Sequence, residues 1–532
     1  MSHEMEHDTG GGGNLLWLCM GLGIFIVIAF ILPTPQSLVD VVEKNGFAEK
    51  MIEWEIAHNP QDAARKTMTV LGIIPMAIIF FATEAIPIGL TGILMPLLAY
   101  FLHLLPRKMI GKTFAGDAPM FLLGVLAMGV AVVDVGLHKR LASWLLGWTK
   151  GFYVPIFVLC ISMSVVGSFI SAHAMCAFMT PVMAAVYFGA VSANSKGGKI
   201  EHDPALAKFL MFTLCFSLNV GGVGSPAAGG RNVIMMGFWS EYNVPMDFFT
   251  WMKYGLPVVP VLGILVAVYM LVLFGRNIKT RDLTPGLQAI KDETAKMGKM
   301  NYAEYVTFGM LLLILALWII GGEELGLGGP SLLALIIPVV FRTTDWGKIL
   351  GGISWDAWLM YCGALTLGAL LKESGAALWL AQTCLQVLGA VGMNEGFGLW
   401  VGLSSLSGLM TNFMSDAGTT ALLGPIVIPM GIMTGNAAEP WATGLAVAFA
   451  TSFAHFLIVG TPNNAIVYGL GIYPDTGEKM IHPLDFIKYG FVLFLLCMVV
   501  VWIVGFQVIF NAVGFPPDIL ETARGVLQSG GR

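Results

Sequence analysis

Residues 117–136 read DAPMFLLGVLAMGVAVVDVG, and residues 356–375 read DAWLMYCGALTLGALLKESG. Both stretches begin with Asp-Ala, carry Gly-x-Leu-x-x-Gly in the middle and end on Gly, at one separation (356 − 117 = 375 − 136 = 239). Each is an apolar segment with internal glycine, and each is too short to cross a bilayer twice. Paired, glycine-interrupted apolar segments in the two halves of a membrane chain are typical of the binding region of a transporter. The pair therefore predicts a membrane transporter built from two inverted repeats.

The composition of the chain supports a membrane location. The 532 residues are 56% apolar and 11% charged, whereas soluble domains carry roughly 25% charged residues. Apolar runs such as 14–33, 68–87 and 487–511 are long enough to cross a hydrocarbon layer of ~30 Å as helices. We expect an all-α polytopic membrane protein with about eleven transmembrane helices, two re-entrant hairpins and broken helices. We place it in the cell membrane, as in a bacterial inner membrane.

The order of the repeated segments predicts a division into scaffold and transport parts. The loop 276–302 holds six Lys and Arg residues and is expected on the cytosolic side by the positive-inside tendency. The predicted parts are a first scaffold part (1–116), a first transport repeat (117–244, hairpin 117–137), a second scaffold part (245–350, polar loop 276–302) and a second transport repeat with the C-terminal helix (351–532, hairpin 356–375).

Two further breaks recur in both halves. Residues 171–173 (SAH) correspond to 415–417 (SDA) (415 − 171 = 244), and residues 230–232 (GRN) correspond to 462–464 (PNN) (464 − 232 = 232). Ordinary close packing of helices explains single glycines, but it does not explain one order of breaks in both halves. Such breaks free backbone groups that lipid cannot satisfy, so they are expected to line a wet cavity that binds ions and anions.

Three ionisable residues fall inside these breaks. Asp416 costs roughly 2.5–3.5 kcal/mol at mid-membrane, which favours a sodium ligand or a protonatable coupling site; the alternative is a structural ion pair with His173 or Arg231. His173 is predicted to be an anion donor or proton site, since an imidazole changes charge between about pH 5 and 8; the alternative is a hydrogen-bonded core residue. Arg231 carries a planar fork suited to carboxylate, sulfate or phosphonate oxygens. It is expected either to clamp the substrate or to replace a sodium ion, the alternative being a snorkelling side chain.

Residues 83–91 (TEAIPIGLT) and 452–469 (SFAHFLIVGTPNNAIVYG), together with the repeats, resemble the divalent anion/sodium symporter family. This family includes INDY-type carriers of dicarboxylates, citrate and sulfate. The resemblance covers nearly the whole chain from about residue 68. It implies a homodimer in which a scaffold domain holds still while a transport domain slides like an elevator.

The chain departs from that family at the residues expected to bind ligands. The family carries Ser-Asn-Thr at each tip, where Asn and Thr contact the substrate and the Ser/Asn region helps to hold sodium. Here the tips are 171–173 (SAH) and 415–417 (SDA), and the first Thr-Pro-Pro-Asn motif is replaced by 229–232 (GGRN). The expected substrate-binding residues are Ser171, His173, Arg231, Asn232, Ser415, Asp416, Thr419, Thr461, Pro462 and Asn463. The expected cation-binding residues are Ser415, Asp416, Gly460 and Asn464.

These residues predict a secondary active transporter of a small anion of the dicarboxylate, sulfate or sulfonate class, coupled to Na⁺ or H⁺. No cofactor beyond a coupling Na⁺ and no nucleic-acid partner is expected. The chain has no Gly-x-x-x-x-Gly-Lys-Ser/Thr loop, and no spacing of nucleophile and base or of metal ligands supports an enzyme. The alternatives are an anion channel, facilitator or exchanger on the same scaffold, and a sensor that binds the substrate without transporting it.

Overall fold

A computed structural model describes residues 11–137, 140, 144, 149–194, 201–296, 298–473 and 475–528. The described residues are helical nearly throughout, and their sole β-pairing is an isolated bridge between Ile472 and Lys479. The longer helices in chain order are α1 (Gly11–Ile26), α2 (Gln36–Lys44), α3 (Phe47–Glu53), α4 (Pro60–Thr83), α5 (Ile88–Phe101), α6 (Arg107–Ala115), α7 (Asp117–Asp134), α9 (Tyr153–Gly167), α10 (Ala172–Asn194), α11 (Pro204–Gly221), α12 (Gly230–Glu241), α13 (Phe248–Gly255), α14 (Val258–Phe274), α15 (Thr284–Lys296), α16 (Tyr302–Ile320), α18 (Gly328–Val340), α19 (Trp346–Gly352), α20 (Trp355–Glu373), α21 (Ala376–Gly389), α22 (Gly396–Phe413), α23 (Asp416–Thr434), α24 (Glu439–Ala450), α25 (Pro462–Leu470), α27 (Phe491–Val500) and α29 (Ile519–Gln528).

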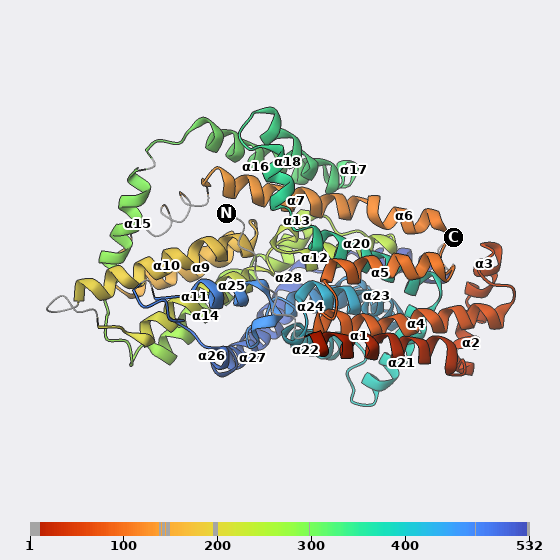
Figure 1. Cartoon of the computed structure of the whole chain (residues 1–532). Helices are drawn as coiled ribbons and strands as arrows, with labels where there is room; N and C mark the ends of the chain where they lie inside the picture. Colours follow the sequence, from red (N-terminus) through yellow and green to blue (C-terminus); the bar gives the residue numbers. More distant parts are fainter. Residues whose placement is uncertain are drawn as a thin grey trace.

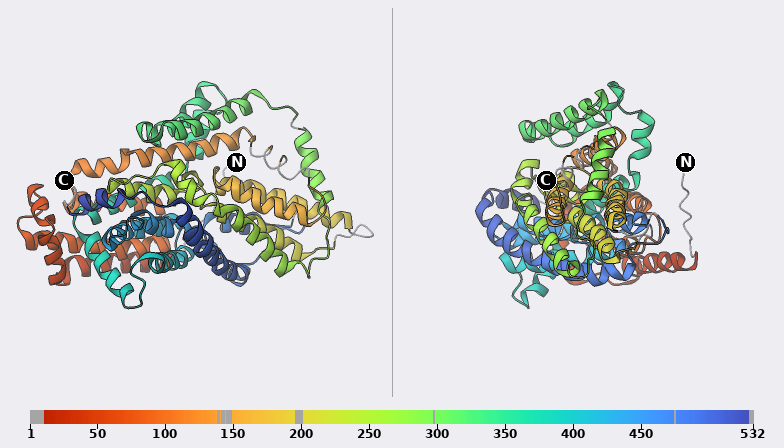
Figure 2. Two further views of the ribbon diagram at one scale, coloured as in Figure 1. Left: turned by 180° about the vertical axis from the view of Figure 1, so that it is seen from behind. Right: turned by 90° about the vertical axis from the view of Figure 1, so that its left-hand side faces the viewer.

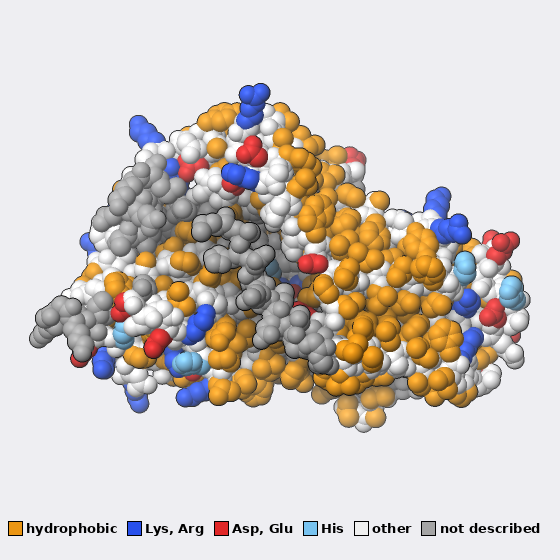
Figure 3. Space-filling view, in the orientation of Figure 1, with side chains coloured by type: hydrophobic (Ala, Val, Ile, Leu, Met, Phe, Trp, Pro, Cys, Tyr) orange, Lys and Arg blue, Asp and Glu red, His pale blue; other side chains and the backbone are white. Residues whose placement is uncertain are grey.

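The helices confirm the expected all-α membrane architecture. Among the described residues, seven helices are long and apolar enough to cross a membrane, and each of two bent pairs can count as a further span. Four shorter apolar helices, among them α9 and α18, accompany them. Figure 3 shows a broad face of hydrophobic side chains, with charged side chains gathered toward the ends of the molecule.

The two repeated glycine segments form a symmetric crossing of the helices α5, α7, α18 and α20, which we call the central crossing. Helix α5 packs against α20, and α18 packs against α7. A Cβ on Gly363 would meet the backbone of Gly92, and a Cβ on Gly124 would meet the backbone of Ser331. These two contacts join equivalent positions (331 − 92 = 363 − 124 = 239). Because each contact exchanges the roles of the two repeats, the halves are related by a pseudo-two-fold axis, as in an isologous interface.

The predicted hairpin ranges need correction. Residues Asp117–Asp134 and Trp355–Glu373 each form one continuous helix. The chain turns only at Gly136 and Gly375, which have φ of +80° and +81°, so neither hairpin closes within its predicted range. The glycines inside these helices permit close contact between helices instead of breaking them.

The helix–break–helix units lie at the Ser-centred breaks. Helices α9 and α10 are joined by residues 168–171 and both pack against α11, whereas α22 and α23 are joined by residues 414–415 and both pack against α24 (Figures 1 and 2). Ser171 Oγ accepts a hydrogen bond from Ala174 N, and Ser415 Oγ accepts one from Gly418 N. The two serines therefore start α10 and α23 in the same way.

Equivalent hydrogen bonds from two asparagine side chains hold the breaks that precede α12 and α25. Asn232 Nδ2 donates to the carbonyl oxygens of Gly222 and Ser225 at 2.8 and 2.7 Å. Asn464 Nδ2 donates to those of Ala454 and Leu457 at 2.7 and 2.8 Å. All three positions are related by one offset (464 − 232 = 454 − 222 = 457 − 225 = 232). Each asparagine satisfies carbonyl groups that the unwound chain leaves without a helical partner.

Candidate functional site

A small cavity lies where the breaks of both repeats meet. Four helices begin beside it, namely α10, α12, α23 and α25, and their N-terminal residues contribute side chains to its wall. A helix N-terminus carries a partial positive charge and unpaired N–H groups, so this arrangement favours an anion. The cavity has a volume of ≈ 10 Å³, about that of one water molecule. Its lining residues are Ala172, His173, Leu218, Asn219, Ala228, Arg231, Asp416, Thr451, Ser452, Ala454, Thr461 and Asn463.

One side of the cavity is formed by an ion pair between the repeats. Arg231 Nη1, at the start of α12, donates to Asp416 Oδ2, at the start of α23. The side chains are 7% and 12% exposed, respectively. Arg231 Nε also donates to Ser452 Oγ at 3.2 Å, and Ala417 N donates to Asp416 Oδ1 at 2.6 Å. The structure therefore shows Asp416 paired with Arg231, which was the alternative to a ligand role.

The opposite side of the cavity is formed by a hydrogen-bonded pair without a carboxylate. His173 Nδ1, at the start of α10, lies 2.8 Å from Asn463 Oδ1, at the start of α25. Asn463 Nδ2 donates to Asn219 Oδ1 at 2.8 Å, so the Asn463 oxygen faces His173 as an acceptor. His173 Nδ1 therefore carries the hydrogen of this bond.

The two pairs are counterparts of one another. Arg231 and Asn463 occupy the same position in their repeats (463 − 231 = 232), and Ala172 and His173 match Asp416 and Ala417 (416 − 172 = 417 − 173 = 244). In each pair, the second residue of α12 or α25 contacts a residue at the start of α23 or α10, which belongs to the other repeat. The chemistry differs, since one arm is a charged pair and the other is a hydrogen bond without a carboxylate.

The structure brings together five of the predicted site residues: His173, Arg231, Asp416, Thr461 and Asn463 line the cavity. The other predicted residues do not line it. The list comprises Ser171 and Ser415, which cap helices; Asn232 and Asn464, which fix the breaks; Gly460, which packs against Asn412; the exposed Pro462; and Thr419, which is buried in α23.

Asn464 has no atom free for the cation role predicted for it. Its Oδ1 accepts from Asn219 Nδ2 at 3.1 Å and from Cys215 Sγ at 3.1 Å, while its Nδ2 holds two carbonyl groups. Within the described part of the chain, no group of three His, Cys, Asp or Glu side chains could hold a metal ion. The cation near Asp416 in this arrangement is the guanidinium of Arg231.

Three polar residues of the cavity wall were missed in the sequence, namely Asn219, Thr451 and Ser452. Asn219 lies in the last turn of α11, and Thr451 and Ser452 directly follow α24. Asn219 and Thr451 are equivalent under the repeat offset (451 − 219 = 232). Extending the repeat comparison a few residues before each break would have found them.

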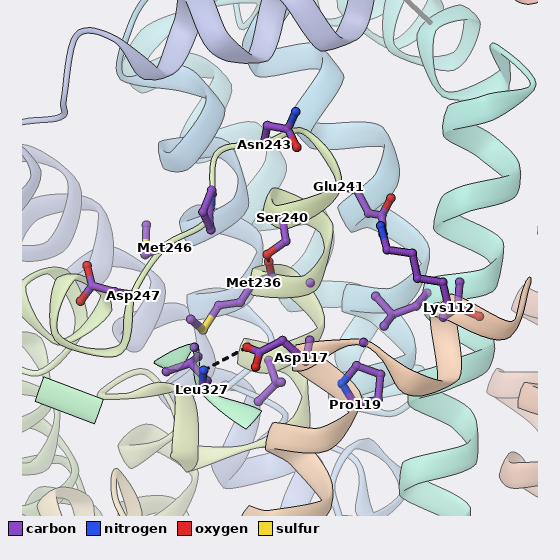
Figure 4. A pocket seen from close by; sticks show the side chains of 18 of the residues that line it. Lys112, Asp117, Pro119, Met236, Ser240, Glu241, Asn243, Met246, Asp247 and Leu327 are labelled. Atoms are coloured by element: carbon purple, nitrogen blue, oxygen red, sulfur yellow. Dashed lines mark hydrogen bonds between the residues drawn. The ribbon is translucent and has the colours of Figure 1, made fainter. Parts of the chain in front are cut away.

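A larger cavity of ≈ 720 Å³ lies at the C-terminal end of α12. Figure 4 shows its wall, with Asp117, Ser240, Glu241, Lys112 and Asp247 from different segments. Asp117 accepts hydrogen bonds from the backbone of Leu327 and Gly328 at 3.0 and 2.8 Å, and Lys372 of α20 lies 3.7 Å from Glu241 of α12. The cavity thus lies between the C-terminal end of α12 and the helices α7 and α20 of the central crossing.

Helices α12 and α25, which follow equivalent breaks in the two repeats, have unequal surroundings. Helix α12 packs against α7 and α20, and a Cβ on Gly237 would lie 3.6 Å from the Cβ of Ala118 and 2.8 Å from Leu365. Gly469 is the counterpart of Gly237 in α25 (469 − 237 = 232). Among the described residues, no atom lies within 4 Å of a Cβ built on Gly469. Among the described helices, the central crossing therefore packs against α12 and not against its counterpart α25.

Comparisons with known proteins agree with the fold. The crystal structure of the Alcanivorax borkumensis YdaH transporter superposes with a TM-score of 0.53 at 15% identity, covering 78% of this chain and 91% of that chain. The Neisseria gonorrhoeae protein MtrF, described within a class of antimetabolite efflux pumps, gives a TM-score of 0.52 at 13% identity and covers 75% and 84%. At these identities the likeness shows the fold alone.

Curated relatives resemble the chain over most of its length. A sodium-dependent dicarboxylate transporter, SdcS, of Staphylococcus saprophyticus is 26% identical over 493 residues, covering 88% of both chains. An uncharacterized transporter of Haemophilus influenzae is 26% identical over 460 residues, covering 83% of this chain and 92% of the relative. The predicted resemblance to the divalent anion/sodium symporters is confirmed. The model of the citrate transporter family matches residues 78–448, and the chain belongs to this family of membrane transporters, which are not enzymes.

Proposed function

We propose that the protein is a secondary active transporter of a small anion, driven by a monovalent cation. The observation that carries the proposal is the buried Arg231 guanidinium at the meeting point of four helix N-termini. Arg cannot lose its charge and presents paired N–H donors, so it selects carboxylate, sulfate or sulfonate oxygens. The helix termini add further positive partial charge at the same point.

The relatives favour an organic anion and sodium. SdcS carries the name of a sodium-dependent dicarboxylate transporter, and the family model is that of citrate transporters. For this chain we propose a carboxylate, with sulfate and sulfonates as the further candidates because they offer the same oxygen geometry to Arg231. We propose Na⁺ or H⁺ as the coupling ion.

The unequal packing of α12 and α25 supports an elevator mechanism. The pair α10 and α25 lies on the side of the polar loop, since α10 packs against α15 and Gly189 contacts Gly286. That pair is free of the central crossing, whereas α12 and α23 pack against α20. Inverted repeats allow a second arrangement in which the two pairs exchange these roles. We propose that the unit α9–α12 with α22–α25 slides along the central crossing, so that α7 and α20, which the sequence analysis placed in the transport repeats, belong to the stationary part. We also propose that the chain forms a homodimer through its scaffold helices.

Uptake into proteoliposomes tests the proposal. Concentrative uptake of succinate, citrate, sulfate or a sulfonate that collapses with the cation gradient is expected. Arg231→Gln should abolish this uptake, while Arg107→Gln, at the exposed start of α6, serves as the matched control. Current that ignores the cation gradient would support a channel, and binding without flux would support a sensor. Either result would overturn secondary active transport.

A further inference from the structure

Asp416 occupies the position that an anionic substrate needs on Arg231. Nη1 is paired with Asp416, and Nε donates to Ser452 Oγ. The remaining face lies against the backbone of the break, because a Cβ on Gly222 would meet Nη2 and one on Gly229 would lie 3.0 Å from Nη1. With ≈ 10 Å³ of open volume, a second carboxylate has no place on this guanidinium. An anion can bind Arg231 only if Asp416 leaves it.

An Asp416 released from Arg231 would be a buried charge without a partner. The residue is 9% exposed, and a buried charge that loses its partner is strongly destabilising. Oxygen atoms are close by, because Thr451, Ser452 and Thr461 line the same cavity. A monovalent cation bound among these oxygens, or a proton on the carboxylate itself, would neutralise the released Asp416.

Other ionisable groups do not supply that charge. Within the cavity wall, the ionisable side chains are His173, Arg231 and Asp416, and His173 is held by Asn463. The described acidic and basic side chains on the helices packed against α23 lie elsewhere. Glu439 of α24 accepts from Gly396 N and Trp400 Nε1. On α12 and α20, Glu241 and Lys372 face one another, Asp356 lies at Gly89 and Glu373 pairs with Lys50. On α29, Arg524 lies at Gly435 and Glu521 is exposed. On α4, Lys66 and Arg65 donate to Leu102 O and Leu32 O, and Asp62 accepts from His58 N.

We infer that the substrate creates its own coupling site by exchange of the ion pair. The anion takes Arg231 from Asp416, and the released Asp416 binds one Na⁺ or one H⁺. One cation enters the site with each anion, so a monovalent anion leaves the net charge of the site unchanged and a divalent anion makes it more negative by one. This inference rests on the proposed function, and it assigns the coupling to Asp416 and not to Asn464.

The exchange predicts a reciprocal linkage between anion and cation. Below saturation, one bound cation per anion raises the apparent anion affinity about tenfold for each tenfold rise in cation activity. Isothermal titration of purified protein with succinate, citrate and sulfate measures this slope. One arm varies Na⁺ at fixed pH against N-methylglucamine, and the other varies pH without Na⁺, so that the two cations are told apart.

Asp416→Asn should bind the anion with no dependence on either cation, and more tightly than the wild type does at low cation. Asp416→Glu should keep the linkage, and the cation slope of the wild-type protein tests the exchange even where Asp416→Asn does not fold. Wild-type binding without cation linkage, or an unchanged slope in Asp416→Asn, would overturn the exchange alone. Absence of binding by every anion tested would overturn the proposed function as well.

Discussion

The indole nitrogen of Trp358 donates a hydrogen bond of 3.0 Å to the carbonyl oxygen of Pro119, and the two residues occupy the same position in their repeats, 239 residues apart. Equivalent positions can touch one another only where a two-fold axis passes between them. The axis relating the halves therefore runs between α7 and α20. The remainder of the molecule is arranged around this crossing, with Asp117 against Gly328 and its counterpart Asp356 against Gly89.

The crossing should be sensitive to added volume. Gly363→Val should lower the unfolding free energy by about 1–3 kcal/mol, because its Cβ would meet the backbone of Gly92. Thermal unfolding in detergent measures the loss. Gly309→Val is the control, since no described atom lies within 4 Å of a Cβ built there. Equal effects of the two substitutions would contradict the close crossing.

Alanine substitution of the adjacent residues Asn463 and Asn464 should give opposite results. Asn464→Ala removes two hydrogen bonds from the break and should lower the unfolding free energy by about 1–3 kcal/mol. Asn463→Ala should change anion affinity more than stability, because Asn463 lines the cavity and holds His173. Thermal unfolding and titration of both variants check this. A stable Asn464→Ala protein with weakened anion binding would reverse the assignment.

Arg231→Lys should weaken anion binding at least tenfold, because a point charge loses the paired N–H geometry of the guanidinium. Titration with succinate and sulfate measures the change. Arg107→Lys, on the exposed start of α6, should leave the affinity unchanged. Wild-type affinity in Arg231→Lys would show that the fork has no part in binding.

His173→Ala should weaken anion binding more than His173→Gln does, because Gln can still donate a hydrogen bond to Asn463 Oδ1, whereas Ala leaves that oxygen without this donor. Titration of both variants with succinate and sulfate measures the difference. Thermal unfolding of the same variants checks that each is folded. Wild-type affinity in a folded His173→Ala protein would make His173 a core residue with no part in anion binding.

The elevator mechanism predicts a specific contact between helices in its second arrangement. Gly237 lies beside Ala118 in this structure, and the repeat offsets place Gly469 beside Ala357 after the exchange. The pair Gly237→Cys/Ala118→Cys should cross-link in the present arrangement, since Cβ atoms 3.6 Å apart suit a disulfide. Gly469→Cys/Ala357→Cys should cross-link only in the other one. Mass spectrometry after oxidation in a background without the native cysteines checks both, and failure of the second pair under turnover would contradict the elevator.

The sequence located the repeats and the breaks at 171–173, 415–417, 230–232 and 462–464, but it misplaced the hairpins. The common offsets identified the two-fold arrangement, and the charged residues Arg231 and Asp416 marked the cavity correctly. The hairpins were misplaced because Gly124 and Gly363 permit contact between helices, and such a glycine looks the same in the sequence as one that breaks a helix. The roles of Asn463 and Asn464 could not be separated either, because they differ only in the direction in which the start of α25 turns each side chain.

The pairing of Arg231 with Asp416 also determines how the carrier responds to an electrical field. A charge moved through 100 mV changes the free energy by about 2.3 kcal/mol. With its own guanidinium and carboxylate paired, the empty site carries no net charge during its return, so membrane voltage does not act on that step. A monovalent anion with one cation crosses neutrally as well, whereas a divalent anion leaves one negative charge to move. The charge of the substrate, and not the protein, would then decide whether transport generates a current.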